Sequence, residues 1–122
     1  ILITHDLGVV AGRTDEVAVM YAGRVVERAP TPDLFKKMRM PYTEALLAAL
    51  PKIDAAPHTP LPAISGRPPD PTRPLAGCSF SPRCRYADDR CRRSKPPLAA
   101  PETPEHQFAC FHPIHTEAGV GA

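Results

Sequence analysis

The sequence predicts a small α/β body followed by an irregular, Pro-rich extension that its cysteines hold together. No proline precedes Pro30, while twelve of the seventeen prolines lie between Pro57 and Pro104. All four cysteines fall between Cys78 and Cys110, in a stretch otherwise poor in apolar residues. A segment that buries little core usually needs a covalent or metal staple to hold its shape. The four sulfurs are the expected staple of the extension.

The chain opens with the apolar run 1–4, which is typical of a buried parallel strand with neighbours on both sides. A short helix over 7–11 follows, and Asp6 is placed to cap its N-terminus. The chain does not begin with methionine, and strands that could flank 1–4 are scarce downstream. We therefore expect this chain to be the C-terminal piece of a longer protein.

The next elements are a hairpin and two helices. Residues 16–21 and 24–28 are rich in strand formers and are separated by a Gly-containing turn, which predicts a hairpin. A helix is expected over 31–37, with Thr31 as its cap and lysines at its end. A second helix over 41–50 places apolar residues on one face, which we expect to pack on the body.

The rest of the chain is predicted to be irregular. Residues 52–74 form a Pro-rich connector, a composition that favours extended backbone and excludes regular ladders. The net charge of +2 is too small to imply nucleic-acid or membrane binding by the whole molecule. The sequence has neither a run of eighteen apolar residues nor a charged-then-apolar leader, so we expect neither a transmembrane helix nor a signal peptide. In the cytosol, the default compartment, cysteines stay reduced or hold metal more often than they form disulfides.

His5 is the first residue that could carry chemistry. It lies between the predicted strand 1–4 and the predicted helix, where open α/β sheets place ligand-contacting residues. A histidine there can donate a hydrogen bond to a phosphate oxygen or orient a water molecule. Its position alone is also consistent with a structural role, in which the histidine only forms hydrogen bonds with nearby backbone.

The cysteines allow three interpretations. Five residues separate Cys78 from Cys84, six separate Cys84 from Cys91, and eighteen separate Cys91 from Cys110, so there is no Cys-x-x-Cys pair of the usual zinc-ribbon kind. The alternatives are a four-thiolate iron-sulfur cluster, a zinc site using His106 or His112, and two disulfides. Positive charge would stabilise a four-thiolate cluster. Five arginines lie close in sequence to the first three cysteines: Arg83, Arg85, Arg90, Arg92 and Arg93.

Two stretches near the start closely resemble the last part of the nucleotide-binding domain of ABC transporters. They are residues 1–10, Ile-Leu-Ile-Thr-His-Asp-Leu-Gly-Val-Val, and 15–27, Asp-Glu-Val-Ala-Val-Met-Tyr-Ala-Gly-Arg-Val-Val-Glu. Residues 40–51 look like a helix of one branch, the ATP-binding subunits of oligopeptide and dipeptide permeases. That branch often has a histidine where this chain has Met40, which argues against a ligand role there. The resemblance continues through 64–69, 77–84 and the later cysteines and histidines, to about Pro113.

The resemblance implies an α/β fragment: the last strands and helices of an ABC-type nucleotide-binding domain, then an irregular, Pro-rich, Cys-stapled extension. It divides the chain into the end of the nucleotide-binding domain at 1–56, the four-Cys oligopeptide/dipeptide transporter extension at 57–115, and a disordered tail at 116–122. It also implies a set of partners: transmembrane permease subunits and a second nucleotide-binding subunit, at the cytoplasmic face of the membrane and without nucleic acid.

The same resemblance implies roles for individual residues. His5 would be the switch histidine, a catalytic residue that contacts the γ-phosphate of ATP and the attacking water. ATP and Mg²⁺ would be cofactors of the full-length protein. A [4Fe-4S] cluster, with Zn²⁺ as the alternative, would be held by Cys78, Cys84, Cys91 and Cys110.

Several motifs of a working ATPase do not occur in the sequence. It has no Gly-rich phosphate loop with its lysine, no Mg²⁺-binding carboxylate motif and no signature motif. We therefore expect the chain alone neither to bind ATP tightly nor to hydrolyse it. The alternative function is a free-standing iron-sulfur or zinc-binding module with a redox or regulatory role.

Overall fold

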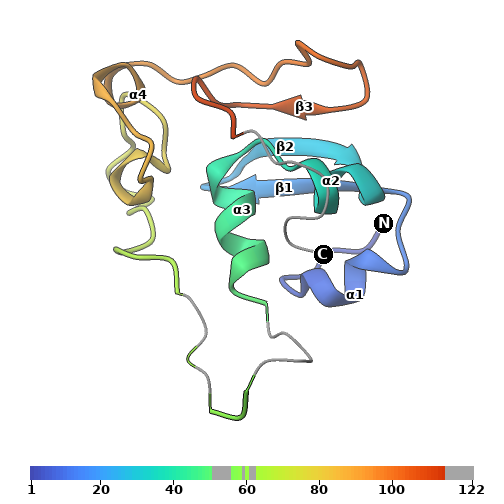
Figure 1. Cartoon of the computed structure of the whole chain (residues 1–122). Helices are drawn as coiled ribbons and strands as arrows, with labels where there is room; N and C mark the ends of the chain where they lie inside the picture. Colours follow the sequence, from blue (N-terminus) through green and yellow to red (C-terminus); the bar gives the residue numbers. More distant parts are fainter. Residues whose placement is uncertain (51–55, 59, 61–62, 115–122) are drawn as a thin grey trace.

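The computed structural model describes residues 1–50, 56–58, 60 and 63–114 (Figure 1). Within these residues, no helix has the length and apolar character needed to cross a membrane. The helices and strands, in chain order, are α1 (Leu7–Ala11), β1 (Glu16–Tyr21), β2 (Arg24–Pro30), α2 (Thr31–Lys37), α3 (Pro41–Ala48), the 3₁₀ turn η1 (Ser81–Arg83), α4 (Asp89–Arg93) and β3 (Gln107–Phe108).

The predicted hairpin is confirmed. β1 and β2 pair antiparallel, and Ala22 and Gly23 form the turn between them with φ angles of 51° and 78°. Two positive φ angles give a turn whose twist matches that of the flanking strands. Side chains of β1 alternate between exposed and buried, so one face of the hairpin packs on the core.

The extension supplies a third strand that sequence patterns did not predict. β3 pairs antiparallel with β2, which gives the sheet order β1-β2-β3, and Glu27 lies opposite Phe108. Figure 1 shows this part of the chain running along the outer edge of β2. The extension is therefore joined to the body through the sheet itself.

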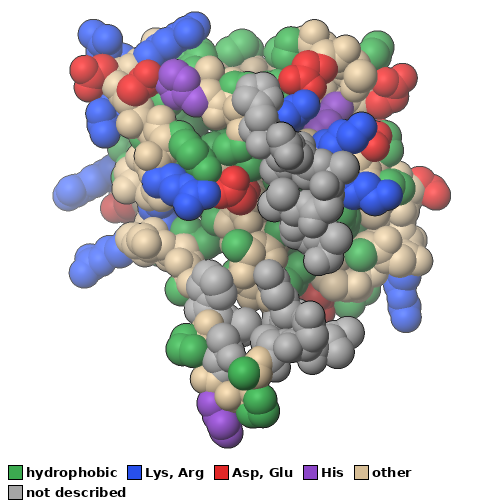
Figure 2. Space-filling model, in the orientation of Figure 1, with side chains coloured by type: hydrophobic (Ala, Val, Ile, Leu, Met, Phe, Trp, Pro, Cys, Tyr) green, Lys and Arg blue, Asp and Glu red, His purple; other side chains and the backbone are tan. Residues whose placement is uncertain are grey.

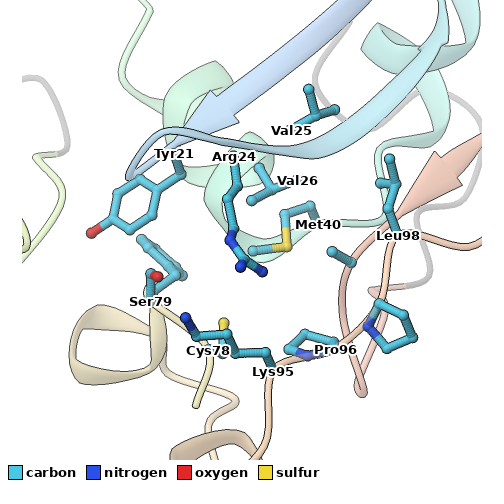
Figure 3. A pocket seen from close by; sticks show the side chains of 13 residues that line it. Tyr21, Arg24, Val25, Val26, Met40, Cys78, Ser79, Lys95, Pro96 and Leu98 are labelled. Carbon is cyan, nitrogen blue, oxygen red and sulfur yellow. The ribbon is translucent and has the colours of Figure 1, made fainter. Parts of the chain in front are cut away.

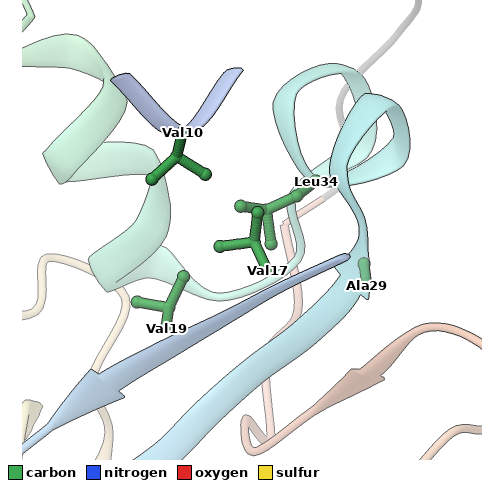
Figure 4. Packing of buried hydrophobic residues seen from close by; sticks show 5 residues of the cluster. All are labelled: Val10, Val17, Val19, Ala29 and Leu34. Carbon is green, nitrogen blue, oxygen red and sulfur yellow. The ribbon is translucent and has the colours of Figure 1, made fainter. Parts of the chain in front are cut away.

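The core of the body lies between the hairpin and the helices. Figure 4 shows its buried cluster, which α1, β1, β2 and α2 all supply. Tyr42 and Leu46 of α3 pack against the same cluster, as the predicted apolar face of that helix requires. The cluster consists of Val10, Val17, Val19, Ala29 and Leu34.

The strand predicted over 1–4 is not formed. Ile1 and Ile3 are almost fully exposed, and these residues have no regular structure. A parallel strand needs a hydrogen-bonding neighbour, and none of the described residues provides one at this position. Asp6 does cap α1 as predicted, because its Oδ1 accepts a hydrogen bond of 2.9 Å from the backbone N–H of Gly8.

Two helix boundaries also differ from the predictions. The N-cap of α2 is Pro30, and Thr31 is the first helical residue. The hydroxyl of Thr31 lies 3.0 Å from the hydroxyl of Thr14 and does not cap the helix. α3 ends at Ala48, two residues before the predicted end at Leu50. A proline disfavours the helical conformation of the residue before it, so helices usually end at or before that residue.

The described part of the connector has neither helix nor strand, as its prolines predict. Ile64 packs against a second buried cluster formed by Tyr21, Met40 and Phe80. Residues 51–55, 59, 61–62 and 115–122, which include the predicted disordered tail 116–122, lie outside the described residues.

Candidate metal centre

The structure brings all four cysteines to one place. Cys78 and Cys84 flank η1, Cys91 lies in α4, and Cys110 follows β3, yet all four line a single small cavity. His112 lines the same cavity. All four residues are free thiols, so the alternative of two disulfides is not formed.

The backbone fixes the positions of these thiols. The N–H of Cys78 donates a hydrogen bond of 2.7 Å to the carbonyl oxygen of Cys91, which holds the first cysteine loop against α4. Gly77 permits this approach, since a Cβ atom there would lie 2.1 Å from the same carbonyl oxygen. Ser81 and Cys84 then continue the loop through hydrogen bonds of 3.0 and 3.3 Å.

Aromatic side chains join the cysteine loop to the body. The ring centroids of Tyr21 and Phe80 lie 5.3 Å apart, edge to face, and Tyr42 packs on both rings. Phe80 is buried between Cys78 and η1, so its ring anchors the loop on β1 and α3. Arg83 adds polar bonds to the carbonyl oxygens of Ile64 and Ser65.

The cavity disfavours thiolates unless a cation is present. Burial raises the pKa of Cys84, Cys91 and Cys110, the last to about 12, and neighbouring thiols add to the effect. A buried thiolate without a positive partner is costly, so these thiols stay protonated near neutral pH. A bound metal would replace the protons.

A second group of donors overlaps the cysteines. One oxygen of Asp88, the sulfur of Cys91 and one ring nitrogen of His112 all lie within 4.8 Å of one another. Asp88 Oδ1 accepts a bond of 3.0 Å from the N–H of Cys91, and Asp88 Oδ2 lies 2.6 Å from His112 Nε2. The hydrogen bonds from Cys91 and the contact with His112 lower the pKa of Asp88 to about 2. Sequence reasoning named His112 but missed Asp88, although the Asp-x-x-Cys spacing at a helix start was a usable signal.

His106 has a different role from the predicted zinc ligand. Its Nε2 lies 2.7 Å from Oε1 of Glu27, and both side chains are buried. Glu27 also accepts hydrogen bonds from the backbone N–H groups of Arg39, at 2.7 Å, and Met40, at 3.1 Å. His106 thus fastens the extension to β2, and it is His112 that the structure places with the cysteines.

Most of the nearby arginines have local partners. Arg85 forms an ion pair with Glu44, Arg92 lies 3.2 Å from Asp89, and Arg90 stacks over the ring of Phe111. Figure 2 shows basic side chains along the edge of the molecule where Figure 1 places α4. The predicted arginine side chains thus surround the cysteines, but acidic or aromatic side chains pair with several of them.

A larger cavity adjoins the cysteines. It has a volume of about 330 Å³ and lies between the end of the hairpin and the extension (Figure 3). Cys78 lines this cavity and the four-thiol cavity alike. Arg24 and Lys95 point into it near Cys78. The larger cavity therefore borders one of the four thiols.

His5 lies apart from the cysteines. It is exposed and directly precedes Asp6, the N-cap of α1. In Figure 1 the N-terminus and α1 lie on the side of the molecule away from α4. The predicted catalytic residue and the predicted metal ligands thus belong to separate parts of the fold.

Comparison with known proteins identifies the family of this chain. Residues 26–91 match the family described as the oligopeptide/dipeptide transporter, C-terminal region. The chain belongs to this family. The oligopeptide transport ATP-binding protein OppD of Mycobacterium tuberculosis is 47% identical over 121 residues, which is 99% of this chain and 19% of that protein. OppD of Escherichia coli is 47% identical over 114 residues, 93% of this chain and 33% of that protein.

A third relative is named for dipeptide transport. The dipeptide transport ATP-binding protein DppF of Haemophilus influenzae is 40% identical over 112 residues, 92% of this chain and 34% of that protein. The chain spans about a fifth to a third of the length of these relatives. They are named as ATP-binding transport proteins, which does not support the alternative of a free-standing metal module.

Proposed function

We propose that this chain is the C-terminal part of an ATP-binding subunit that powers oligopeptide or dipeptide transport by ATP binding and hydrolysis. The family match, together with identity of 40–47% over most of the chain, carries this proposal. The subunit works with transmembrane permease subunits and a second nucleotide-binding subunit, at the cytoplasmic face of the membrane. Residues 1–56 end the nucleotide-binding domain and 57–115 form the extension.

His5 contacts the γ-phosphate of ATP and the attacking water in this proposal. Its exposed ring, held next to the cap of α1, suits a residue that meets a ligand from outside the fragment. Hydrogen bonds to a transferring phosphoryl group stabilise the charge that develops in the transition state. ATP and Mg²⁺ would bind chiefly through residues of the longer protein.

The full-length protein with His5→Ala, assembled with its permease subunits, tests this role. We expect ATP hydrolysis to fall roughly 100-fold or more. His58→Ala is the matched control, because His58 is exposed in the connector and should leave the rate unchanged. Full ATPase activity in the His5→Ala protein would show that His5 is not part of the catalytic site.

We also propose that the four cysteines hold a [4Fe-4S] cluster. Four thiols from separate segments line one cavity, which is the donor set such a cluster requires. The cluster would supply four metal-thiolate bonds, and these would hold the Pro-rich segment on the body. Anaerobic purification should yield iron and sulfide in roughly stoichiometric amounts. A colourless protein loaded with zinc would exclude this assignment.

A further inference from the structure

The carboxylate, thiol and imidazole of Asp88, Cys91 and His112 form a donor set that shares only Cys91 with the four thiols. Their ligand atoms lie within 4.8 Å of one another, although Cys91 and His112 come from separate segments of the extension. Oxygen, sulfur and nitrogen donors together suit borderline divalent ions such as Zn²⁺ and Co²⁺. Capping of α4 accounts for the contact of Asp88 with Cys91, but it does not require the imidazole of His112 to meet the same carboxylate.

The three donors are held in place without a metal. Asp88 and Cys91 are three residues apart at the start of α4, and the bond from the Cys91 N–H to Asp88 Oδ1 fixes the carboxylate. Its other oxygen, Oδ2, faces His112 Nε2 at 2.6 Å. The backbone N–H of His112 donates to the sulfur of Cys110 at 3.3 Å, which fixes the His112 segment as well. The side chains therefore need little rearrangement to bind an ion.

The position of the group also leaves room for a further ligand. Cys91 is buried, whereas about half of the side-chain surface of Asp88 and of His112 is exposed. An ion between them would be reached from solvent on one side. Three protein ligands with one open position are typical of zinc sites that keep a water molecule.

We propose that Asp88, Cys91 and His112 bind one divalent transition-metal ion, such as Zn²⁺, when the four-thiol cavity holds no cluster. The ion replaces the proton of the Cys91 thiol, which passes to water. His112 binds the ion through a ring nitrogen that carries no proton, so the proton it shares with Asp88 moves to the other ring nitrogen or to water, and no redox change is involved. Because Cys91 serves both donor sets, the single ion and the cluster exclude each other. The inference rests on this geometry and does not depend on the proposed transport function.

Cobalt provides the probe, because bound Co²⁺ reports its ligands by absorption. The full chain is prepared anaerobically, free of iron, and titrated with Co²⁺. We expect one equivalent to bind with tetrahedral bands and a charge-transfer band of the strength of a single thiolate. Asp88→Asn, Cys91→Ser and His112→Gln should each weaken binding about tenfold or more. Asn remains a good N-cap, so the first of these variants keeps α4 intact.

Matched variants separate this site from a four-thiol site. Asp89→Asn alters the neighbouring carboxylate, and His58→Gln alters an exposed histidine of the connector, so both should bind Co²⁺ as the unchanged chain does. Cys84→Ser should also retain binding. Urea unfolding of each variant identifies any that fails to fold, and His112→Gln, at an exposed position, provides the decisive readout in that case.

Two results would overturn the proposal. One is the absence of Co²⁺ binding by the folded, iron-free chain. The other is binding that is lost in Cys84→Ser but kept in His112→Gln and Asp88→Asn, with a charge-transfer band of several thiolates. ATPase measurements on the full-length protein address a separate question, so failure of the transport proposal would leave these outcomes unchanged.

Discussion

Glu27 of β2 and His106 of the extension are 79 residues apart in the chain, and their side chains meet at 2.7 Å inside the protein. Glu27 is fully buried and His106 is 7% exposed. The same carboxylate accepts the N–H groups of Arg39 and Met40, which connect α2 to α3. One side chain thus holds together a strand, the segment between two helices and the end of the extension.

Replacing this carboxylate should be strongly destabilising. Glu27→Ala removes the acceptor of three donors, two of which are buried, and we expect the free energy of unfolding to fall by about 3–5 kcal/mol. Urea unfolding measures the change. Glu16→Ala is the control, because the ion pair of Glu16 with Arg28 is half exposed and contributes at most about 1 kcal/mol. Equal effects of the two variants would contradict the central role of Glu27.

Gly77→Ala should prevent the cysteine loop from closing on α4. The added Cβ would lie 2.1 Å from the carbonyl oxygen of Cys91 and 2.5 Å from that of Arg92, so the backbone must move. We expect lower iron and sulfide content after anaerobic purification, with the hairpin body still folded. Gly12→Ala is the control, because a Cβ at Gly12 meets no atom within 4 Å. Full cluster loading of Gly77→Ala would show that the close approach is unnecessary.

Cys110 should react slowly with iodoacetamide in the folded, metal-free protein. Burial raises the pKa of its thiol to about 12, so little thiolate exists at pH 8. Peptide mass spectrometry over time should show alkylation at least about tenfold slower than for the same residue in urea, where the ordinary pKa returns. The folded-state rate should rise as the pH increases towards 12. Equal rates in the two states would mean that the thiol is not buried.

The hairpin turn offers a way to stabilise the protein. Ala22 has a φ of 51°, a conformation that favours Asn over Ala, and Gly23 follows with a φ of 78°. Ala22→Asn should raise the free energy of unfolding by about 0.5–1 kcal/mol. Gly23→Ala should lower the free energy of unfolding by about 1–2 kcal/mol, because a residue with a Cβ atom is disfavoured at this positive φ. Thermal unfolding checks both, and a destabilised Ala22→Asn variant would contradict the turn geometry.

Local signals were sufficient for much of the fold. The hairpin, α1 with its Asp6 cap and the start of α3 follow from strand formers, a turn dipeptide, a capping residue and Pro41. Each of these features depends on residues that are close together in the sequence. The separation between a packed first part and an irregular second part also followed from the distribution of proline.

Contacts between distant segments could not be predicted in the same way. The pairing of β3 with β2 and the bond between Glu27 and His106 depend on how the extension returns to the body. The convergence of Asp88 with His112 is of the same kind. The failed prediction at 1–4 has a related cause, because a parallel strand is decided by neighbours that these residues do not have here.

The third strand of the sheet also has a consequence for the newly made chain. During synthesis β2 is complete long before β3, since Glu27 precedes its partner His106 by 79 residues. At the pace of translation, the free edge of β2 stays uncovered for roughly 4–16 s. Uncovered strand edges invite pairing with other chains, and charged side chains discourage it. The charged side chains of Arg24 and Arg28 on β2 are therefore placed to discourage such pairing until β3 has been synthesised.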